Sequence, residues 1–354
     1  MANVLITGAG GFLGTELTRV FIESGHTVRA GDIDGVDLRE HMALGAQPIC
    51  LDVTDPPSMV EASRDTDVVV HASGIFDLSV DPDRLWAVNA TGAQTAAEAA
   101  AQCGVKRFVI VSSTSVYGRC GDGVDEASPK NPTHPYDRSK AEGERLAIEA
   151  CEKNGMAWTA IRPTLIYGPG GRYGIAQAAA LLALRIQLGL DSMRIAQGGP
   201  MGHHVHVTDV ARAAELVASH PDAVGEVFNV VDDAPMPAGD MIRTLSNAVG
   251  MHIKVPALPW WMAKLGRLFK PLARRLLVGE NRKLAYLWSK VVAGKDLQNA
   301  LLPRLDVDWL DYMFIDHTYK NDRLKSLGFE FDYPTAYEGM PKTLAWYKQE
   351  RWLP

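Results

Sequence analysis

The chain has 354 residues, of which 47% are hydrophobic and 22% charged, and this composition excludes a globally disordered protein. Its length allows one large domain or two modest ones, with a core that needs neither disulfides nor metal. The net charge of −6 argues against a nucleic-acid-binding protein, because such proteins usually have a basic domain.

The four cysteines lie far apart without a CxxC pair, so we interpret them as reduced thiols. The N-terminal residues lack the basic segment of a signal peptide. No stretch approaches the roughly 20 apolar residues that a membrane-spanning helix requires. Together these observations predict a cytoplasmic protein.

Short apolar strands alternate with helical patterns over much of the chain. The predicted strands are residues 4–6, 27–30, 48–51, 67–71, 107–112, 157–162, 204–208 and 227–230. The predicted helices are residues 14–24, 89–103, 136–153, 175–188 and 209–219. Apolar strands separated by helices indicate an α/β fold with a parallel sheet that is covered on both faces.

Glycines and a proline at residues 168–171 interrupt this alternation, and prolines and tryptophans accumulate later in the chain. We therefore predict two domains. Residues 1–166 and 204–232 form the larger domain, which contains the sheet. Residues 167–203 and 233–354 form a smaller, discontinuous, mostly helical domain, which binds the substrate over the carboxyl edge of the sheet.

A glycine-rich loop joins the first strand to the first helix, with the sequence Thr7-Gly8-Ala9-Gly10-Gly11-Phe12-Leu13-Gly14. Gly8 permits a tight turn, Gly11 lets the backbone approach a pyrophosphate, and Gly14 lets helix and strand pack closely. The start of the helix offers free N–H groups and a partial positive charge. This context predicts a dinucleotide site in a doubly wound parallel sheet of the Rossmann type.

The end of the second strand predicts which dinucleotide binds. Asp32 stands where a carboxylate can accept hydrogen bonds from both ribose hydroxyls and repel a 2′-phosphate, which favours NAD. Arg29 and Arg39 leave NADP as the alternative.

Two further segments are predicted to contact the cofactor. Asp52 and Val53 follow the third strand and would flank the adenine, although an aspartate after a strand is also a common turn residue. The small residues Ala72, Ser73 and Gly74 end the fourth strand, where the backbone runs close to a ligand.

Tyr136 and Lys140 are four residues apart and share one face of a predicted helix. A tyrosine with a pKa of ~10 is a poor base at neutral pH, and a nearby ammonium is expected to lower that pKa. Ser113 follows the apolar strand 107–112 and can hydrogen-bond a substrate oxygen. These residue types suit hydride transfer between a carbinol and a nicotinamide.

Four motifs in order resemble the extended short-chain dehydrogenase/reductase superfamily, also described as NAD-dependent epimerases and dehydratases. They are the glycine loop, the SSxxVYG segment at 112–118, the YxxxK pair and Arg162-Pro163-Thr164-Leu165-Ile166-Tyr167-Gly168-Pro169. The resemblance covers about residues 1–235 well and the rest loosely. It implies that Tyr136 is the acid/base, that Lys140 tunes it and binds ribose, and that Ser113 is the partner of the substrate oxygen.

The same resemblance implies further contacts. Pro163, Leu165 and Ile166 would line the nicotinamide, and Asn89 would lie near the cofactor ribose. It also implies a homodimer, built from the helices near residues 91–103 and 138–153.

Within the superfamily, dehydratases resemble one another in placing Asp-Glu after the active serine or threonine, where this chain has Thr114 and Ser115. Dehydration is therefore disfavoured. Sugar-nucleotide enzymes usually bind a diphosphate with asparagine and arginine in the second domain, whereas residues 172–182 are mostly apolar and favour a hydrophobic substrate.

Residues 260–283 carry seven basic side chains and one acid in an acidic protein. This pattern predicts either a lid that touches a membrane surface or an apolar ligand, or a packed helical hairpin with snorkelling lysines and arginines. A similar tail occurs in the 3β-hydroxysteroid dehydrogenase-like branch, towards which we lean.

His203, His204 and His206 lack the cysteine or carboxylate neighbours of a metal site, so we interpret them as structural and predict no metal.

Our first hypothesis is an NAD-dependent oxidoreductase that interconverts a secondary alcohol and a ketone on a small hydrophobic substrate, with a sterol as one candidate. An NAD-dependent sugar-nucleotide epimerase would use the same residues with transient oxidation. A non-catalytic dinucleotide-sensing protein is the third hypothesis.

Overall fold

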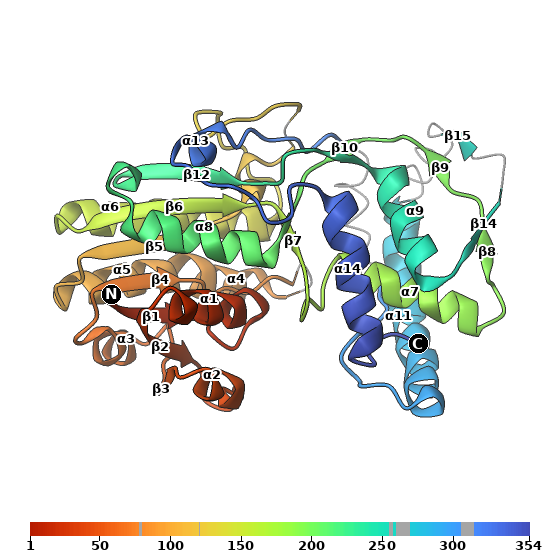
Figure 1. Cartoon of the computed structure of the whole chain (residues 1–354), viewed down its shortest axis with the longest axis horizontal. Helices are drawn as coiled ribbons and strands as arrows, with labels where there is room; N and C mark the ends of the chain where they lie inside the picture. Colours follow the sequence, from red (N-terminus) through yellow and green to blue (C-terminus); the bar gives the residue numbers. More distant parts are fainter. Residues whose placement is uncertain (78–79, 120, 255–257, 260–269, 306–314) are drawn as a thin grey trace.

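The computed structural model describes residues 1–77, 80–119, 121–254, 258–259, 270–305 and 315–354. Figure 1 shows a sheet flanked by helices on the left and a group of helices with short strands on the right. Strand β7 (Leu165–Tyr167) lies between them. Across the described residues, each helix is either too short or too polar to span a membrane.

The main sheet has seven parallel strands in the order β12-β6-β5-β4-β1-β2-β3. These strands are β1 (Asn3–Thr7), β2 (Thr27–Asp32), β3 (Gln47–Cys50), β4 (Val68–His71), β5 (Arg107–Val111), β6 (Ala157–Pro163) and β12 (Glu226–Val230). The order reverses between β1 and β4, and ligands of such sheets bind beyond the carboxyl ends of the strands at this reversal. The predicted α/β fold with a doubly wound parallel sheet is confirmed.

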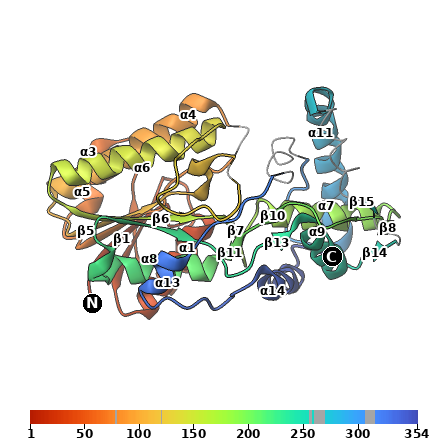
Figure 2. The same cartoon turned by 90° about the horizontal axis from the view of Figure 1, so that it is seen from above.

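Helices cover both faces of the sheet, as Figure 2 shows. One face carries α1 (Phe12–Glu23) and α8 (Val207–Ser219), whose buried apolar side chains join those of the sheet in one cluster. The other face carries α3 (Pro56–Ser63), α5 (Gly92–Gln102) and α6 (Pro135–Lys153), which form a second cluster with it. Two short helices, α2 (Arg39–Ala43) and α4 (Pro82–Trp86), lie in connections.

Two predicted elements differ in the structure, and several helices, among them α3, were not predicted. The predicted strand 204–208 ends at His206, and β11 (His204–His206) pairs with β7 outside the main sheet. The predicted helix 89–103 begins with a π-helical turn at Ala87–Thr91, which precedes α5. Such turns often occur at functional sites.

The helical group contains α7 (Ile175–Gln187), α9 (Ala238–Val249), α11 (Lys270–Lys295) and α14 (Ala336–Gln349). Its short strands are β8 (Ser192–Met193), β9 (Ala196–Gln197), β10 (Met201–Gly202), β13 (Met236–Pro237), β14 (His252–Ile253) and β15 (Leu258–Pro259). A third apolar cluster, which includes the buried Trp288 and Tyr347, joins the four helices.

The predicted domain boundaries stay a prediction, and one segment packs differently from them. Leu324, in α13 (Asp322–Ser326), and Phe329 belong to the apolar cluster of the sheet. Residues 317–331 were assigned to the helical domain, yet α13 lies beside β12 in Figure 1. Of the basic segment 260–283, residues 260–269 lie outside the described residues, so its predicted membrane contact stays a prediction.

Candidate active site

The glycine loop is built by close backbone approaches. Gly8 has φ +71°, and a Cβ there would lie 2.8 Å from the Cα of Ser73. A Cβ on Gly14 would lie 2.0 Å from the carbonyl oxygen of Gly8. Helix α1 begins at Phe12, and its cap residue Gly11 has no side chain to bind the first N–H groups. The loop therefore has the geometry that a pyrophosphate site requires, and its role stays a prediction.

The first turn of α1 also faces the residues after β7. Phe12 and Leu13 stand at its start, and a Cβ on Gly171 would lie 3.2 Å from the tip of the Phe12 ring. The loop that would bind the cofactor thus touches the segment that leads into the helical group.

Asp32 ends β2 with its carboxylate fixed by two backbone donors. Its Oδ2 accepts from the N–H of Gly10 at 2.9 Å, and its Oδ1 accepts from the N–H of Ile33 at 2.8 Å. The carboxylate is therefore held against the glycine loop, where the sequence predicts that it reads the adenosine ribose.

The two arginines that left NADP as an alternative are engaged elsewhere. Arg39 pairs with Asp37 at 2.6 Å. Arg29 donates to the carbonyl oxygens of Ala62 and Arg64 at 2.9 and 2.8 Å. Each guanidinium would have to leave its own partner before it could bind a 2′-phosphate, which favours NAD.

Asp52 and Val53, predicted beside the adenine, follow β3. Asp52 Oδ1 accepts from both the N–H and the hydroxyl of Thr54, at 2.8 and 2.7 Å, so it forms a local turn. The Val53 side chain is buried in the cluster under α3 and α5. Any contact of Val53 with a cofactor would therefore use its backbone.

Ala72, Ser73 and Gly74 connect the glycine loop to the predicted reacting centre. The N–H of Ser73 donates to the hydroxyl of Thr7 at 3.2 Å. A Cβ on Gly74 would lie 3.8 Å from Lys140 Nζ. These small residues let the chain pass between the two parts of the site, and their predicted contact with the cofactor stays a prediction.

The start of α6 is fixed immediately before Tyr136. His134 Nδ1 accepts from the N–H of Tyr136 at 3.2 Å, and Asp137 accepts from the N–H of His134 at 3.1 Å. Pro135 occupies the first helical position, where its missing N–H costs nothing. This capping box orients the first turn of α6, which carries the predicted acid/base.

Ser113, Tyr136 and Lys140 meet at the carboxyl end of β5. The Tyr136 hydroxyl is hydrogen-bonded to the Ser113 side chain. Ser113 Oγ also accepts from the N–H of Ser115 at 3.1 Å, which holds it in place. Lys140 Nζ donates to the carbonyl oxygen of Val111 at 2.7 Å. The structure thus brings the three residues together, and their catalytic roles stay a prediction.

The acidity of Tyr136 differs from the sequence-based expectation. Burial raises its pKa, the hydrogen bond to Ser113 opposes that shift, and the charge of Asp137 adds to it. Burial lowers the pKa of Lys140 to about 8. In this structure burial of the phenol outweighs the lowering of its pKa that the sequence led us to expect from Lys140, whose ammonium binds a backbone carbonyl, and the tuning role of Lys140 stays a prediction. Tyr136 is a neutral phenol at pH 7.

Asn89 lies in the π-helical turn, and its amide binds protein groups. Its Oδ1 accepts from the N–H of Ile75 at 2.8 Å, and its Nδ2 donates to Ile75 O at 3.1 Å and Ser139 Oγ at 3.0 Å. A Cβ on Gly143 would lie 2.0 Å from the carbonyl oxygen of Asn89, so α6 packs directly on this turn. Asn89 orients the chain after β4, and its contact with ribose stays a prediction.

A buried polar network behind the reacting centre was missed in the sequence. Arg162, at the end of β6, donates to Glu144 on α6 at 2.9 and 2.6 Å and to Tyr117 Oη at 2.6 Å. Tyr117 donates to Asn229 at 2.9 Å, and Lys130 donates to Glu144 at 2.6 Å. Burial opposes ionisation of Glu144, but Arg162 and Lys130 lower its pKa to about 2. An arginine at the end of an otherwise apolar strand is the signal that could have revealed this network.

The residues predicted to line the nicotinamide lie beyond the end of β6. Pro163 ends that strand and is buried, whereas Leu165 and Ile166 in β7 are half-buried. Thr164 between them donates to the carbonyl oxygen of His203 at 3.1 Å. Their contact with a nicotinamide stays a prediction.

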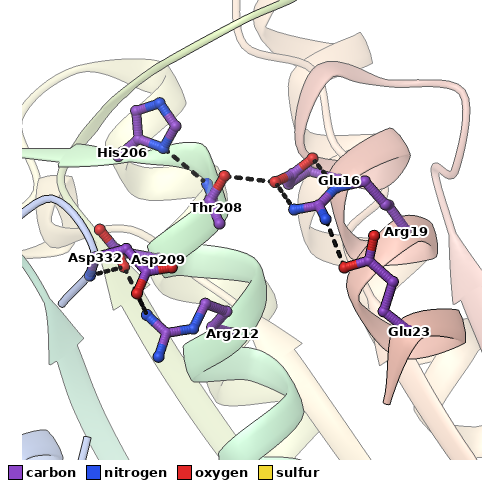
Figure 3. Close-up of polar contacts among 8 residues, drawn as sticks. All are labelled: Glu16, Arg19, Glu23, His206, Thr208, Asp209, Arg212 and Asp332. Carbon is purple, nitrogen blue, oxygen red and sulfur yellow. Dashed lines mark hydrogen bonds and ion pairs between the residues drawn. The ribbon is translucent and has the colours of Figure 1, made fainter. Parts of the chain in front are cut away.

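His206 begins α8 and links it to α1 (Figure 3). Its Nδ1 accepts from the N–H of Thr208 at 3.3 Å, and its ring stacks on Tyr333 with centroids 3.7 Å apart. Thr208 in turn donates to Glu16 on α1 at 2.5 Å. His206 therefore has a helix-capping role.

The neighbouring histidines are also held by the protein. His203 Nδ1 accepts from the N–H of Tyr319 at 2.9 Å, and burial lowers the pKa of His203, His204 and His206 to about 4. Asp209 accepts from the N–H groups of Asp332 and Tyr333 (Figure 3 draws the first of these bonds). Within the part of the chain that the structure describes, no group of three potential ligands could hold a metal ion.

Most apolar residues of the segment 172–182 do not form the substrate pocket that the sequence led us to expect. Its apolar residues Ile175, Ala179 and Leu182 are buried in the core of the helical group. Tyr173, just before α7, is 49% exposed. Core packing therefore explains most of the apolar pattern from which a hydrophobic pocket was predicted.

Comparison with known proteins identifies the class to which this fold and site belong. The family model described as the NAD dependent epimerase/dehydratase family matches residues 4–230, well over half of the chain. The chain therefore belongs to the NAD dependent epimerase/dehydratase family, and it is an NAD-dependent enzyme of the oxidoreductase type. The predicted resemblance is confirmed.

Individual relatives lie on both branches that the sequence left open. The chain is 27% identical over 277 residues to a UDP-glucose 4-epimerase of Vibrio cholerae, covering 75% of this chain and 82% of that protein. It is 28% identical over 291 residues to a 3 beta-hydroxysteroid dehydrogenase/Delta 5-->4-isomerase of Mycobacterium tuberculosis, covering 76% of each chain. Its fold resembles the UDP-glucose 4-epimerase of Thermus thermophilus solved with NAD, with a TM-score of 0.71, 21% identity and coverage of 98% and 99%.

Proposed function

We propose that the protein interconverts a secondary alcohol and a ketone on a small apolar substrate, with NAD as the hydride carrier. The observation that carries the proposal is the hydrogen bond between Tyr136 and Ser113, with Lys140 one helical turn away at the end of β5. A substrate oxygen placed between the two hydroxyls would contact a proton donor and an orienting group at once.

In the reducing direction, the neutral Tyr136 gives its proton to the ketone oxygen while the carbonyl carbon receives a hydride. Bound NADH would supply that hydride from its nicotinamide. Ser113 hydrogen-bonds the same oxygen and holds the carbonyl in place. The tyrosinate left behind is stabilised by Ser113 and by the ammonium of Lys140, and oxidation runs through the same steps in reverse.

Three features support this activity. Thr114 and Ser115 provide no carboxylates for elimination of water. The relative in Mycobacterium tuberculosis is named for a hydroxysteroid dehydrogenase activity. Tyr136 carries its proton at neutral pH and can donate it to a ketone oxygen. The relatives in Vibrio cholerae and Mycobacterium tuberculosis are both named as enzymes, which favours catalysis over a non-catalytic sensor.

A sugar-nucleotide epimerase is the second candidate, favoured by the similarity to the Vibrio cholerae protein. It would use Tyr136 in the same way, with NAD retained and no net consumption of cofactor. The two candidates separate in a screen of NADH oxidation or formation with sterols, alkyl ketones and UDP-sugars, run with NAD and NADP side by side.

The test of the mechanism is Tyr136→Phe, which removes only the hydroxyl. Turnover should fall at least ~10²–10⁴-fold, the usual contribution of a general acid. The affinity for NADH, measured by fluorescence titration, should stay within about twofold, because the lost proton donor is not needed for binding. Tyr337→Phe, at an exposed tyrosine of α14, is the control and should retain full turnover. Wild-type turnover in the Tyr136 variant contradicts the assignment.

We also propose that the enzyme forms a homodimer through α5 and α6, the helices that the family resemblance implies. Sedimentation velocity of the full chain would measure the mass directly, and a monomer at micromolar concentration contradicts this proposal.

A further inference from the structure

An aromatic row starts at the reacting tyrosine and leads away from it. The ring of Phe76 packs edge-to-face on Tyr136, with centroids 5.1 Å apart at 82°. On its other side, Phe76 packs edge-to-face on Tyr173, with centroids 5.9 Å apart at 86°. Phe76 is 39% and Tyr173 is 49% exposed, whereas Tyr136 is 9% exposed. Two large rings therefore remain partly uncovered beside a buried reactive hydroxyl.

Phe76 is held in place by a closed circuit of contacts. The amide of Asn89 binds both backbone groups of the preceding residue Ile75. Asn89 also donates a hydrogen bond to the hydroxyl of Ser139. That hydroxyl in turn donates to the carbonyl oxygen of Tyr136 at 2.8 Å. The circuit closes where the Phe76 ring meets the Tyr136 ring. A ring fixed in this way has little conformational entropy to lose when a ligand covers it.

The two exposed rings come from the two sides of the molecule. Phe76 follows β4 of the sheet, and Tyr173 precedes α7 of the helical group. Next to Phe76, Asp77 forms an ion pair with Arg304 at 3.5 Å, so the two sides also meet there. A substrate with its oxygen at Tyr136 would extend along rings contributed by both sides.

We propose that Phe76 and Tyr173 are specificity-determining residues that bind the apolar ring next to the reacting carbon of the substrate. The inference rests on the proposed alcohol–ketone activity and names its substrate class: a ketone carried on an alicyclic or fused ring. Exposed aromatic rings are good partners for apolar rings, because covering them removes apolar surface from water. They carry no charge that could pair with a sugar diphosphate.

The experiment measures KM and kcat with NADH for 1-decalone, a fused-ring ketone, and for 2-butanone. In Phe76→Ala and in Tyr173→Ala, KM for 1-decalone should rise about tenfold, while kcat stays within about threefold. KM for 2-butanone should stay within about twofold. Tyr173→Phe should behave as the wild type, because the ring and not the hydroxyl makes the contact. Tyr337→Ala, at an exposed tyrosine on α14, is the matched control and should change neither KM.

If KM rises equally for both ketones in Phe76→Ala, Phe76 has a merely structural role and the inference is overturned. An unchanged KM for 1-decalone in both alanine variants overturns it as well. Calorimetric binding of 1-decalone to the NADH-loaded Tyr136→Phe enzyme, with and without Phe76→Ala, separates this inference from the proposed function. Weaker binding in the double variant supports the aromatic contact even where the wild type shows no turnover. Equal binding overturns the contact even where the wild type reduces ketones.

Discussion

The sheet and the helical group are held together in different ways. Around the sheet, helices α1 and α6 approach neighbouring backbone so closely that a Cβ on Gly14 or Gly143 would lie 2.0 Å from a carbonyl oxygen. In the helical group, a Cβ on Gly239 of α9 would likewise lie 2.3 Å from the carbonyl oxygen of Ala196, but large side chains such as Trp288 and Tyr347 fill the space between helices. A close approach demands one residue type at one position, whereas a packed core accepts many combinations of similar volume. This difference explains why the sheet could be predicted from the sequence and most of the helical group could not.

The largest expected effect is in the core of the helical group. Trp288→Ala should lower the free energy of unfolding by about 3–5 kcal/mol, because Trp288 is 1% exposed and its removal leaves a cavity. Trp288→Phe should cost less than half as much, since it also removes an indole N–H that has no partner among the described residues. Urea unfolding measures the free energy of unfolding of both variants. If both lose the same amount, the volume of the side chain at position 288 is not what stabilises this core.

The matching change in the sheet tests close approach. Gly14→Ala should cost about 1–3 kcal/mol and weaken NAD binding at least about tenfold, because the new methyl group collides with the backbone of the glycine loop. Gly294→Ala, at a helical glycine in α11 with open space around it, is the control and should be neutral or stabilising by up to ~1 kcal/mol. If Gly14→Ala keeps the stability and the NAD affinity of the wild type, close backbone approach does not distinguish the sheet from the helical group.

A smaller effect per residue comes from histidines that burial keeps neutral. Burial lowers the pKa of His71 on β4 to about 3 and the pKa values of His203, His204, His206 and His317 to about 4. Below pH 6.5 the unfolded chain binds protons that the folded chain does not, so stability should fall as the pH drops. Each such histidine lowers the free energy of unfolding by about 1.4 kcal/mol for every unit by which the pH drops, down to about pH 4.

His71 allows this acid sensitivity to be localised to the sheet. Its Nδ1 lies 3.0 Å from the hydroxyl of Thr7. Urea unfolding at pH 7.5, 6.0 and 5.0 measures the slope, and His71→Gln should reduce it by the contribution of one group. A slope that this variant leaves unchanged would show that His71 titrates normally in the folded enzyme.

The sequence predicted the sheet and the meeting of Ser113, Tyr136 and Lys140, because both depend on local patterns. Strand alternation is visible in a short window, and the spacing of Tyr136 and Lys140 fixes one helical face. The pKa of Tyr136 could not be predicted, because it depends on how deeply the fold buries the phenol. The pairing of Arg162 with Glu144 and the packing of Phe76 on Tyr136 join residues whose proximity only the tertiary structure creates.

Helices α9 and α14 show the same limit. Neither was predicted, although α9 carries buried Met241 and Leu245 and α14 carries buried Leu344. Their apolar residues are interrupted by glycine and, in α14, by Pro341, so their periodicity is weak without the partners that cover them. The apolar residues of α7 did predict a structural feature, but they predicted a substrate pocket, whereas most of them are buried in the core of the helical group.

The return of residues 317–331 to the sheet has a consequence for dissecting the enzyme. The family match stops at residue 230, yet Leu324 and Phe329 complete the apolar layer under α8, and Arg323 pairs with Glu226 on the edge strand β12. A fragment cut at the family boundary would leave that layer unfinished and its last strand open to association with other chains. We therefore expect the sheet to depend on residues 317–331 for its stability, so that the full chain is the unit to express when either part is studied.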